Sequence, residues 1–151
     1  MVASALEAAD APEPGSVTVV LTDDAELSEL NAEHMGVDGT TDVLSFPMLP
    51  PESFRHDQAQ VGPRKRAPRR PVGRARRTHI GDIAISVERA IEQSAAGRGG
   101  QTGDVRWSPA DEVRLLVTHG TLHLCGWDHV EPAEESAMRQ LEGRLLERSG
   151  A

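Results

Sequence analysis

The stretch His119–His129, which reads HGTLHLCGWDH, constrains this chain more than any other part of its sequence. His119 and His123 are four residues apart, so in a helix they lie on one face, about one turn apart. Gly126 can adopt the left-handed conformation that ends a helix, which would let the chain reverse and bring His129 back toward the same point. Three neutral imidazoles without a fourth protein ligand in the stretch are typical of an open, catalytic zinc site, in which water completes the coordination. We therefore predict one zinc ion, bound by His119, His123 and His129.

Length and composition indicate one ordinary globular domain, residues 1–151, long enough to bury a core. Hydrophobic residues make up 38% of the chain but aromatic residues only 3%, so aliphatic side chains must supply the packing. No apolar run approaches the ~18 residues of a membrane span and no signal peptide is recognisable, so we expect a cytoplasmic protein without a membrane partner. The one cysteine, Cys125, would point away from His123 in a helix, which favours a buried structural thiol over a metal ligand.

The charge of the chain is unevenly distributed. The formal net charge is −8, yet residues 55–77 carry nine basic side chains and one acid, a local balance of +8 against −16 elsewhere. Prolines recur through residues 48–78, so we predict a flexible loop there. Two roles remain open for it, a solvated disordered insertion or a basic arm that binds RNA phosphates. The arginines predicted for RNA binding are Arg64, Arg66, Arg69, Arg70 and Arg77.

Hydrophobic periodicity predicts the order of the secondary structure elements. Residues 1–15 show no clear period and are expected to be frayed or loosely packed. Strands are predicted at 16–22, 41–47 and 79–87, and helices at 24–35, 87–96, 109–125 and 132–148. The helix at 109–125 would be about 25 Å long and is expected to cross the domain as a central helix that carries the metal histidines on its last two turns. The final helix is expected to serve packing, through Ala137, Met138, Leu141 and Leu145.

Cap residues define where these helices begin and end. Asp23, with Glu26 three residues later, predicts a capping box, and Gly36 ends that helix. Ser86 is predicted to cap the next helix. Ser108, followed by a proline and an acid at the third position, predicts a strong start for the central helix.

Several of these stretches together carry a resemblance to a known family. The residues His119–His129 present the pattern HGxLHLxGxDH in full, and residues 41–47 (TDVLSFP), residues 81–86 (GDIAIS) and the pair Leu30-Asn31 accompany it in order. In these motifs the chain resembles the YbeY family of bacterial ribosomal RNA maturation factors, which are metal-dependent single-strand endoribonucleases. The resemblance runs from about Val17 to the C-terminus and leaves out residues 48–78.

The resemblance implies an α+β fold, with a small mixed sheet flanked by helices, and zinc held by His119, His123 and His129. It further implies work on single-stranded RNA and the small ribosomal subunit: processing of the 3′ end of 16S rRNA and quality control of ribosomes. A small-subunit ribosomal protein and the GTPase Era are the protein partners that it suggests. In the mechanism that we expect, zinc activates a water molecule and polarises a phosphoryl oxygen.

Imidazoles that bind a metal usually donate their outer N–H group to an acceptor. Asp82 and Asp128 are predicted for this role, and a turn or capping role is the alternative reading of both.

The chain departs from the family at Met35, where the family often carries an arginine thought to serve catalysis. Either that role is dispensable, or a loop arginine such as Arg55 or Arg77 takes it, or activity is weak. Two other functions therefore stay open. A zinc protease would need a glutamate after the first histidine, where this chain has Gly120. A non-catalytic, zinc-stabilised ribosome-assembly factor is the other, and Met35 makes it more plausible.

Overall fold

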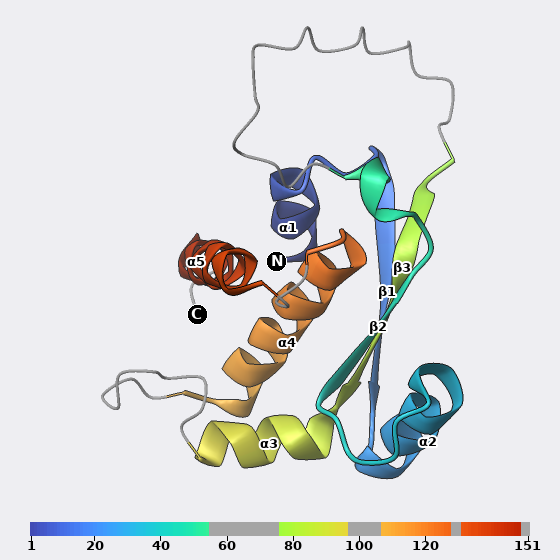
Figure 1. Ribbon diagram of the computed structural model, residues 1–151. Helices are drawn as coiled ribbons and strands as arrows, with labels where there is room; N and C mark the ends of the chain where they lie inside the picture. Colours follow the sequence, from blue (N-terminus) through green and yellow to red (C-terminus); the bar gives the residue numbers. More distant parts are fainter. Residues whose placement is uncertain (55–75, 97–106, 128–130, 149–151) are drawn as a thin grey trace, which may run out of the picture.

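The computed structural model describes residues 1–54, 76–96, 107–127 and 131–148 (Figure 1). The helices and strands in chain order are α1 (Val2–Ala8), β1 (Gly15–Thr22), α2 (Asp24–Met35), β2 (Val43–Pro47), a 3₁₀ turn (Pro51–Ser53), β3 (Thr78–Ser86), α3 (Val87–Ala95), α4 (Pro109–Leu124) and α5 (Pro132–Arg148). Within those ranges the strands form one small mixed sheet with helices around it, which confirms the expected α+β fold. No helix of the described ranges is both long and apolar enough to cross a membrane.

The sheet has the strand order β1-β3-β2, with β3 in the middle. β1 runs parallel to β3 and β2 runs antiparallel to it. Pro47 ends β2 on an edge of the sheet, where its missing N–H group costs no ladder hydrogen bond, as the sequence predicts. The central strand is buried on both faces because successive side chains alternate between them. Ile83 and Ile85 face the main core, and Ala84 packs with Leu27 and Leu44 on the opposite face.

Helix α4 crosses the molecule beside the sheet, with α1, α3 and α5 arranged around it (Figure 1). Its start is fixed by the predicted cap: the Ser108 hydroxyl accepts the Asp111 N–H, and the Asp111 carboxylate accepts the Ser108 N–H. Leu116, Val117, Leu122 and Leu124 bury its apolar side against β3 and α5. The prediction of a central helix is therefore confirmed, although the helix ends at Leu124 and Cys125 is its C-cap.

The prediction for residues 1–15 is wrong. They form α1 and the beginning of β1, and Ala5 and Ala9 are completely buried in the main core. Periodicity gave a weak signal here because the two completely buried residues are alanines, while Val2 and Leu6 are only partly buried against the core.

The predicted loop at 48–78 is ordered at both of its ends. The Met48 N–H donates to the Ile80 carbonyl at 2.9 Å, a 3₁₀ turn follows at Pro51–Ser53, and Phe54 is buried in the main core. At the other end β3 already begins at Thr78. Residues 55–75, the most basic part of the segment, lie outside the described residues.

The other helix ends follow the sequence closely. The Asp23 carboxylate accepts the Glu26 N–H at 2.9 Å, and Gly36 is left-handed with φ +66°. The capping box is incomplete, because the Glu26 carboxylate accepts a hydrogen bond from the Thr22 hydroxyl instead of the Asp23 N–H. Ser86 caps α3 as predicted. On α5, Met138, Leu141 and Leu145 are buried but Ala137 is exposed.

Candidate metal centre

The two helix histidines of the predicted metal site lie together on the last two turns of α4. The Nε2 atoms of His119 and His123 are 2.9 Å apart, and the two ring centroids are 4.5 Å apart with the rings at 75°. Two nitrogens that each lie 2.0–2.1 Å from a tetrahedral zinc ion are about 3.3 Å apart. The observed separation is close to this value, so the pair fits the binding of one ion between its Nε2 atoms.

The end of α4 takes the form that the sequence indicates. Gly126 is left-handed with φ +84°. The Gly126 N–H donates to the His123 carbonyl at 2.9 Å, and the Trp127 N–H donates to the Leu122 carbonyl at 3.1 Å. These two bonds make a Schellman motif, which closes the helix and turns the chain directly after the second histidine.

The third predicted ligand lies outside the described residues, because the structure describes the chain up to Trp127 and again from residue 131. His129 and Asp128 fall in this gap, so their roles stay predictions. Among the described residues, no three His, Cys, Asp or Glu side chains gather as a metal site.

The position of α4 against the sheet depends on Gly120, the residue after the first histidine. A Cβ atom at Gly120 would lie 3.0 Å from Ile83 Cγ2 and 3.1 Å from the Ser45 hydroxyl. That hydroxyl donates to the Gly120 carbonyl at 3.2 Å. Because glycine allows this approach, α4 lies directly on β2 and β3, and both histidines come to the edge of β2.

The two histidines open into a cleft of about 490 Å³. Its other wall is Met35 together with most of the segment that resembles the family between residues 41 and 47: Thr41, Asp42, Val43, Leu44, Ser45 and Pro47. Asp42 is held there by α3, because the Gln93 side-chain amide donates to its carboxylate at 2.9 Å.

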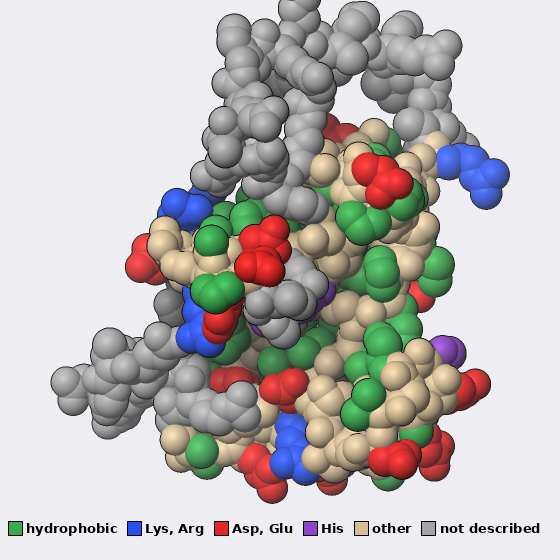
Figure 2. All heavy atoms as spheres, viewed as in Figure 1, with side chains coloured by type: hydrophobic (Ala, Val, Ile, Leu, Met, Phe, Trp, Pro, Cys, Tyr) green, Lys and Arg blue, Asp and Glu red, His purple; other side chains and the backbone are tan. Residues whose placement is uncertain are grey.

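No lysine or arginine of the described residues lines this cleft. Figure 2 shows acidic side chains gathered over the lower part of this face, around α2 and α3.

A carboxylate that the sequence analysis missed contacts the first histidine. Glu142 Oε1 of α5 lies 2.6 Å from His119 Nδ1, and the Glu142 side chain is only 12% exposed. A signal was present in the sequence, since residue 142 follows Met138 by four positions and so falls in the apolar stripe of its helix. A glutamate in such a stripe needs a partner.

Asp82 does not lie beside the two described histidines of the predicted metal site. Its carboxylate lies 2.8 Å from His79 Nε2, and it occupies the same side of β3 as Ala84, which faces α2. The helix histidines come from α4, which packs on the other side with Ile83. Strand alternation therefore separates Asp82 from His119 and His123, and Glu142 takes the outer nitrogen of His119. A contact between Asp82 and His129 stays a prediction, because His129 lies outside the described residues.

Of the arginines predicted to bind RNA, the structure describes only Arg77. The others, Arg64, Arg66, Arg69 and Arg70, lie outside the described residues, and so does Arg55. Arg77 is exposed directly before β3 and is not among the residues that line the cleft.

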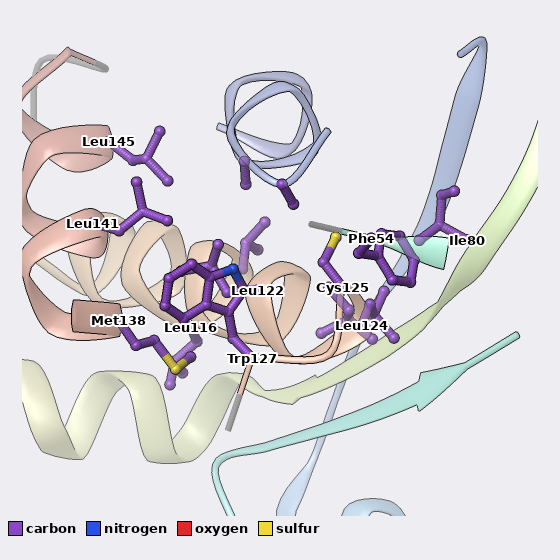
Figure 3. Packing of buried hydrophobic residues seen from close by; sticks show 14 of the residues in the cluster. Phe54, Ile80, Leu116, Leu122, Leu124, Cys125, Trp127, Met138, Leu141 and Leu145 are labelled. Carbon is purple, nitrogen blue, oxygen red and sulfur yellow. The ribbon is translucent and has the colours of Figure 1, made fainter. Parts of the chain in front are cut away.

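Cys125 is the buried structural thiol that the sequence favours. It caps α4 in the main core, where Figure 3 shows it with Phe54 and Leu124 at the end of the cluster near the sheet. Burial raises the pKa of the Cys125 thiol to about 12. The neutral thiol is a poor metal ligand, since metals bind the thiolate.

Comparison with known proteins identifies the family. The model of the family described as endoribonuclease YbeY matches residues 1–150. This chain belongs to the endoribonuclease YbeY family. The sequence resemblance is thereby confirmed, and with it membership of a family of enzymes that act on RNA.

Curated members of the YbeY family align over most of the chain. An endoribonuclease YbeY of Salinispora tropica is 41% identical over 133 residues, which are 86% of this chain and 71% of the relative. One of Roseiflexus is 40% identical over 138 residues, 91% of this chain and 72% of the relative. One of Mycobacterium leprae is 39% identical over 132 residues, 87% of this chain but only 62% of the relative.

Proposed function

We propose that this chain is a zinc-dependent single-strand endoribonuclease that matures the 3′ end of 16S rRNA and takes part in ribosome quality control. The observation that carries the proposal is the pair of Nε2 atoms, 2.9 Å apart, at the wall of a cleft in a member of an endoribonuclease family. The cleft is formed by three separate parts of the sequence: Met35, residues 41–47 and the histidines of α4. Their meeting in one place supports a shared functional site.

In this proposal His119, His123 and His129 hold the ion. When bound, zinc supplies Lewis acidity and activates water for attack on a phosphodiester. The chain itself contributes three things: the imidazole donors, a carboxylate on His119 Nδ1, and a cleft wall whose apolar residues Val43 and Pro47 can lie against a nucleobase.

The RNA substrate and the partners belong to the same proposal. The basic segment of residues 55–77, with Arg64, Arg66, Arg69, Arg70 and Arg77, supplies the positive charge that the described cleft lacks. A cytoplasmic protein that acts on the small ribosomal subunit would meet a small-subunit ribosomal protein and the GTPase Era there.

The packing of α4 argues against a zinc protease. Such enzymes need a glutamate directly after the first histidine as general base. Here that position is Gly120, where even a Cβ atom would press on Ile83 and Ser45. The backbone position is thus unsuited to a glutamate that reaches the metal.

A non-catalytic assembly factor is the second candidate, and Met35 is the observation that favours it. Met35 ends α2 at the wall of the cleft, where an arginine could have neutralised developing charge on phosphate. A thioether cannot do this.

The test is a cleavage assay on the purified protein with two substrates, single-stranded RNA and casein. The proposal predicts that RNA is cut, that chelation abolishes the cut and zinc restores it, and that casein stays intact. Casein digestion would favour the protease. Zinc binding and binding to small-subunit particles without RNA cleavage would favour the assembly factor.

The ribosomal part of the proposal needs its own substrate. Small-subunit particles that carry unprocessed 16S rRNA should yield the mature 3′ end when incubated with the zinc-loaded protein. Cleavage of free RNA with no processing of the particles would contradict this part and leave the nuclease assignment intact.

A further inference from the structure

We infer that Glu142 is a positioning residue, which orients His119 and fixes the proton of its imidazole so that Nε2 is available to the metal ion. This inference rests on the proposed function, because it assigns a role within the same site. It gives α5, which the sequence predicts to serve only packing, a part in the metal centre.

The burial of Glu142 shows that its contact is not incidental. A carboxylate that is 12% exposed loses most of its hydration, which is costly unless a donor replaces the water. His119 Nδ1, at 2.6 Å, is the donor that the structure provides. Buried pairs of this kind contribute little net stability compared with an apolar residue of similar size, so stability alone is a weak reason for a glutamate in this stripe.

The geometry of the contact determines which nitrogen faces the cleft. An ionised carboxylate only accepts hydrogen bonds, so the proton of a neutral His119 must reside on Nδ1. Its lone pair is then on Nε2, the atom that lies 2.9 Å from His123 Nε2. A carboxylate that fixes the outer nitrogen of a histidine typically strengthens the binding of a metal by its other nitrogen.

The anchoring of α5 makes this orientation rigid. Met138, Leu141 and Leu145 are buried in the main core against α4, on either side of Glu142 in the sequence. Figure 3 shows Met138 with Trp127 and Leu116, and Leu141 and Leu145 projecting from α5 toward the cluster. The carboxylate is therefore held in place before any ion binds.

The experiment compares Glu142→Ala and Glu142→Gln with the wild type, and Glu147→Ala serves as the control, since Glu147 is an exposed residue of the same helix. Two quantities are measured in the full-length protein. One is the zinc dissociation constant, by competition with a chelating dye. The other is the tautomer of metal-free His119, from long-range ¹H–¹⁵N spectra at a pH where the imidazole is neutral.

We expect Glu142→Ala to weaken zinc binding about 10- to 100-fold and to move the His119 proton from Nδ1 to Nε2. Glu142→Gln should keep the Nδ1–H form, because its amide oxygen still accepts that hydrogen bond, and should recover part of the affinity. Glu147→Ala should change neither quantity. The glutamine variant and the circular dichroism spectra of all variants separate positioning from loss of fold.

If the wild type binds zinc and Glu142→Ala keeps both the zinc affinity and the His119 tautomer of the wild type, the positioning role is overturned. The proposed function is left standing by that result. A wild type that binds no zinc would overturn both. An equal loss of affinity in Glu142→Gln and Glu142→Ala, with both proteins folded and the Nδ1–H form kept in neither, would also contradict the inference.

Discussion

Ser45 and Gly120 join the edge strand β2 to helix α4: the Ser45 hydroxyl donates to the Gly120 carbonyl at 3.2 Å. The two residues come from motifs 75 residues apart in the sequence, and their contact brings the wall of the cleft next to His119. The contact is possible because position 120 has no side chain, since a Cβ atom there would lie 3.0 Å from Ile83.

The Gly120→Ala substitution tests this close approach. We expect it to lower the free energy of unfolding by about 1–3 kcal/mol, because α4 or Ile83 must shift to admit the methyl group. The measurement is urea denaturation of the purified protein. Gly143→Ala on α5 is the matched control: nothing lies within 4 Å of the added Cβ atom, so the change should raise stability by about 0.5–1 kcal/mol. The same sign at both positions would contradict the packing argument.

Met35→Arg tests whether the cleft lacks a cation. The new guanidinium would stand at the wall of the cleft and at the C-terminal end of α2, where a positive charge is favourable. We expect single-stranded RNA to bind about three- to tenfold more tightly at low salt, with the gain fading as salt increases. Filter binding across a salt series measures this. Val37→Arg adds the same charge at an exposed residue that does not line the cleft, and an equal gain there would show that only net charge matters.

Cys125 should resist thiol reagents in the folded protein. Its pKa is raised to about 12 by burial, so the thiol stays neutral at pH 7–9 and is also shielded from contact. We expect a disulfide reagent such as DTNB to label less than a tenth of the protein in an hour at pH 8, roughly the result for an inert buried thiol. Full labelling should follow in denaturant. Rapid labelling of the folded protein would show that the thiol is accessible.

Asp111 gives the central helix a stability that depends on pH. Its hydrogen bonds with the Ser108 side chain and N–H group, helped by Arg114, hold the pKa of the Asp111 carboxyl below the ordinary value of 3.8. Because this pKa is lower in the folded than in the unfolded chain, the stabilisation is complete well above pH 3.8 and is lost as the pH falls through 3.8 toward the folded value.

Asp111→Asn removes a negative charge from the first turn of α4 and should therefore lower the free energy of unfolding by about 0.3–1 kcal/mol at pH 7. The difference from the wild type should shrink below pH 3.8. Denaturation at pH 7, 5 and 3 measures it. Asp38→Asn, at an exposed loop position, should show no such trend. A constant difference for Asp111→Asn at all three values would contradict the account.

The elements with strong local signals could be predicted from the sequence. Ser108, Pro109 and Asp111 determine the start of α4 through hydrogen bonds within four residues, and Gly126 determines its end in the same way. The pairing of His119 with His123 follows from the helical repeat alone. These features need no knowledge of the rest of the chain.

The features that were missed depend on contacts between distant segments. Glu142 is 23 residues from His119, and only the packing of α5 on α4 brings them together. Asp82 is predicted to contact a ligating histidine, but the alternation of β3 puts it on the side of Ala84, away from His119 and His123. Phe54 follows a proline-rich stretch, and its burial depends on α4 and β3 being in place.

The most direct test of the central claim is the zinc content and RNA cleavage of His123→Ala, measured beside His34→Ala, whose histidine is exposed on α2. We predict that the wild type and His34→Ala bind one zinc ion per chain and cut single-stranded RNA, whereas His123→Ala loses both. If His123→Ala keeps stoichiometric zinc and cuts RNA at the rate of the wild type, the histidine pair on α4 is not the metal centre.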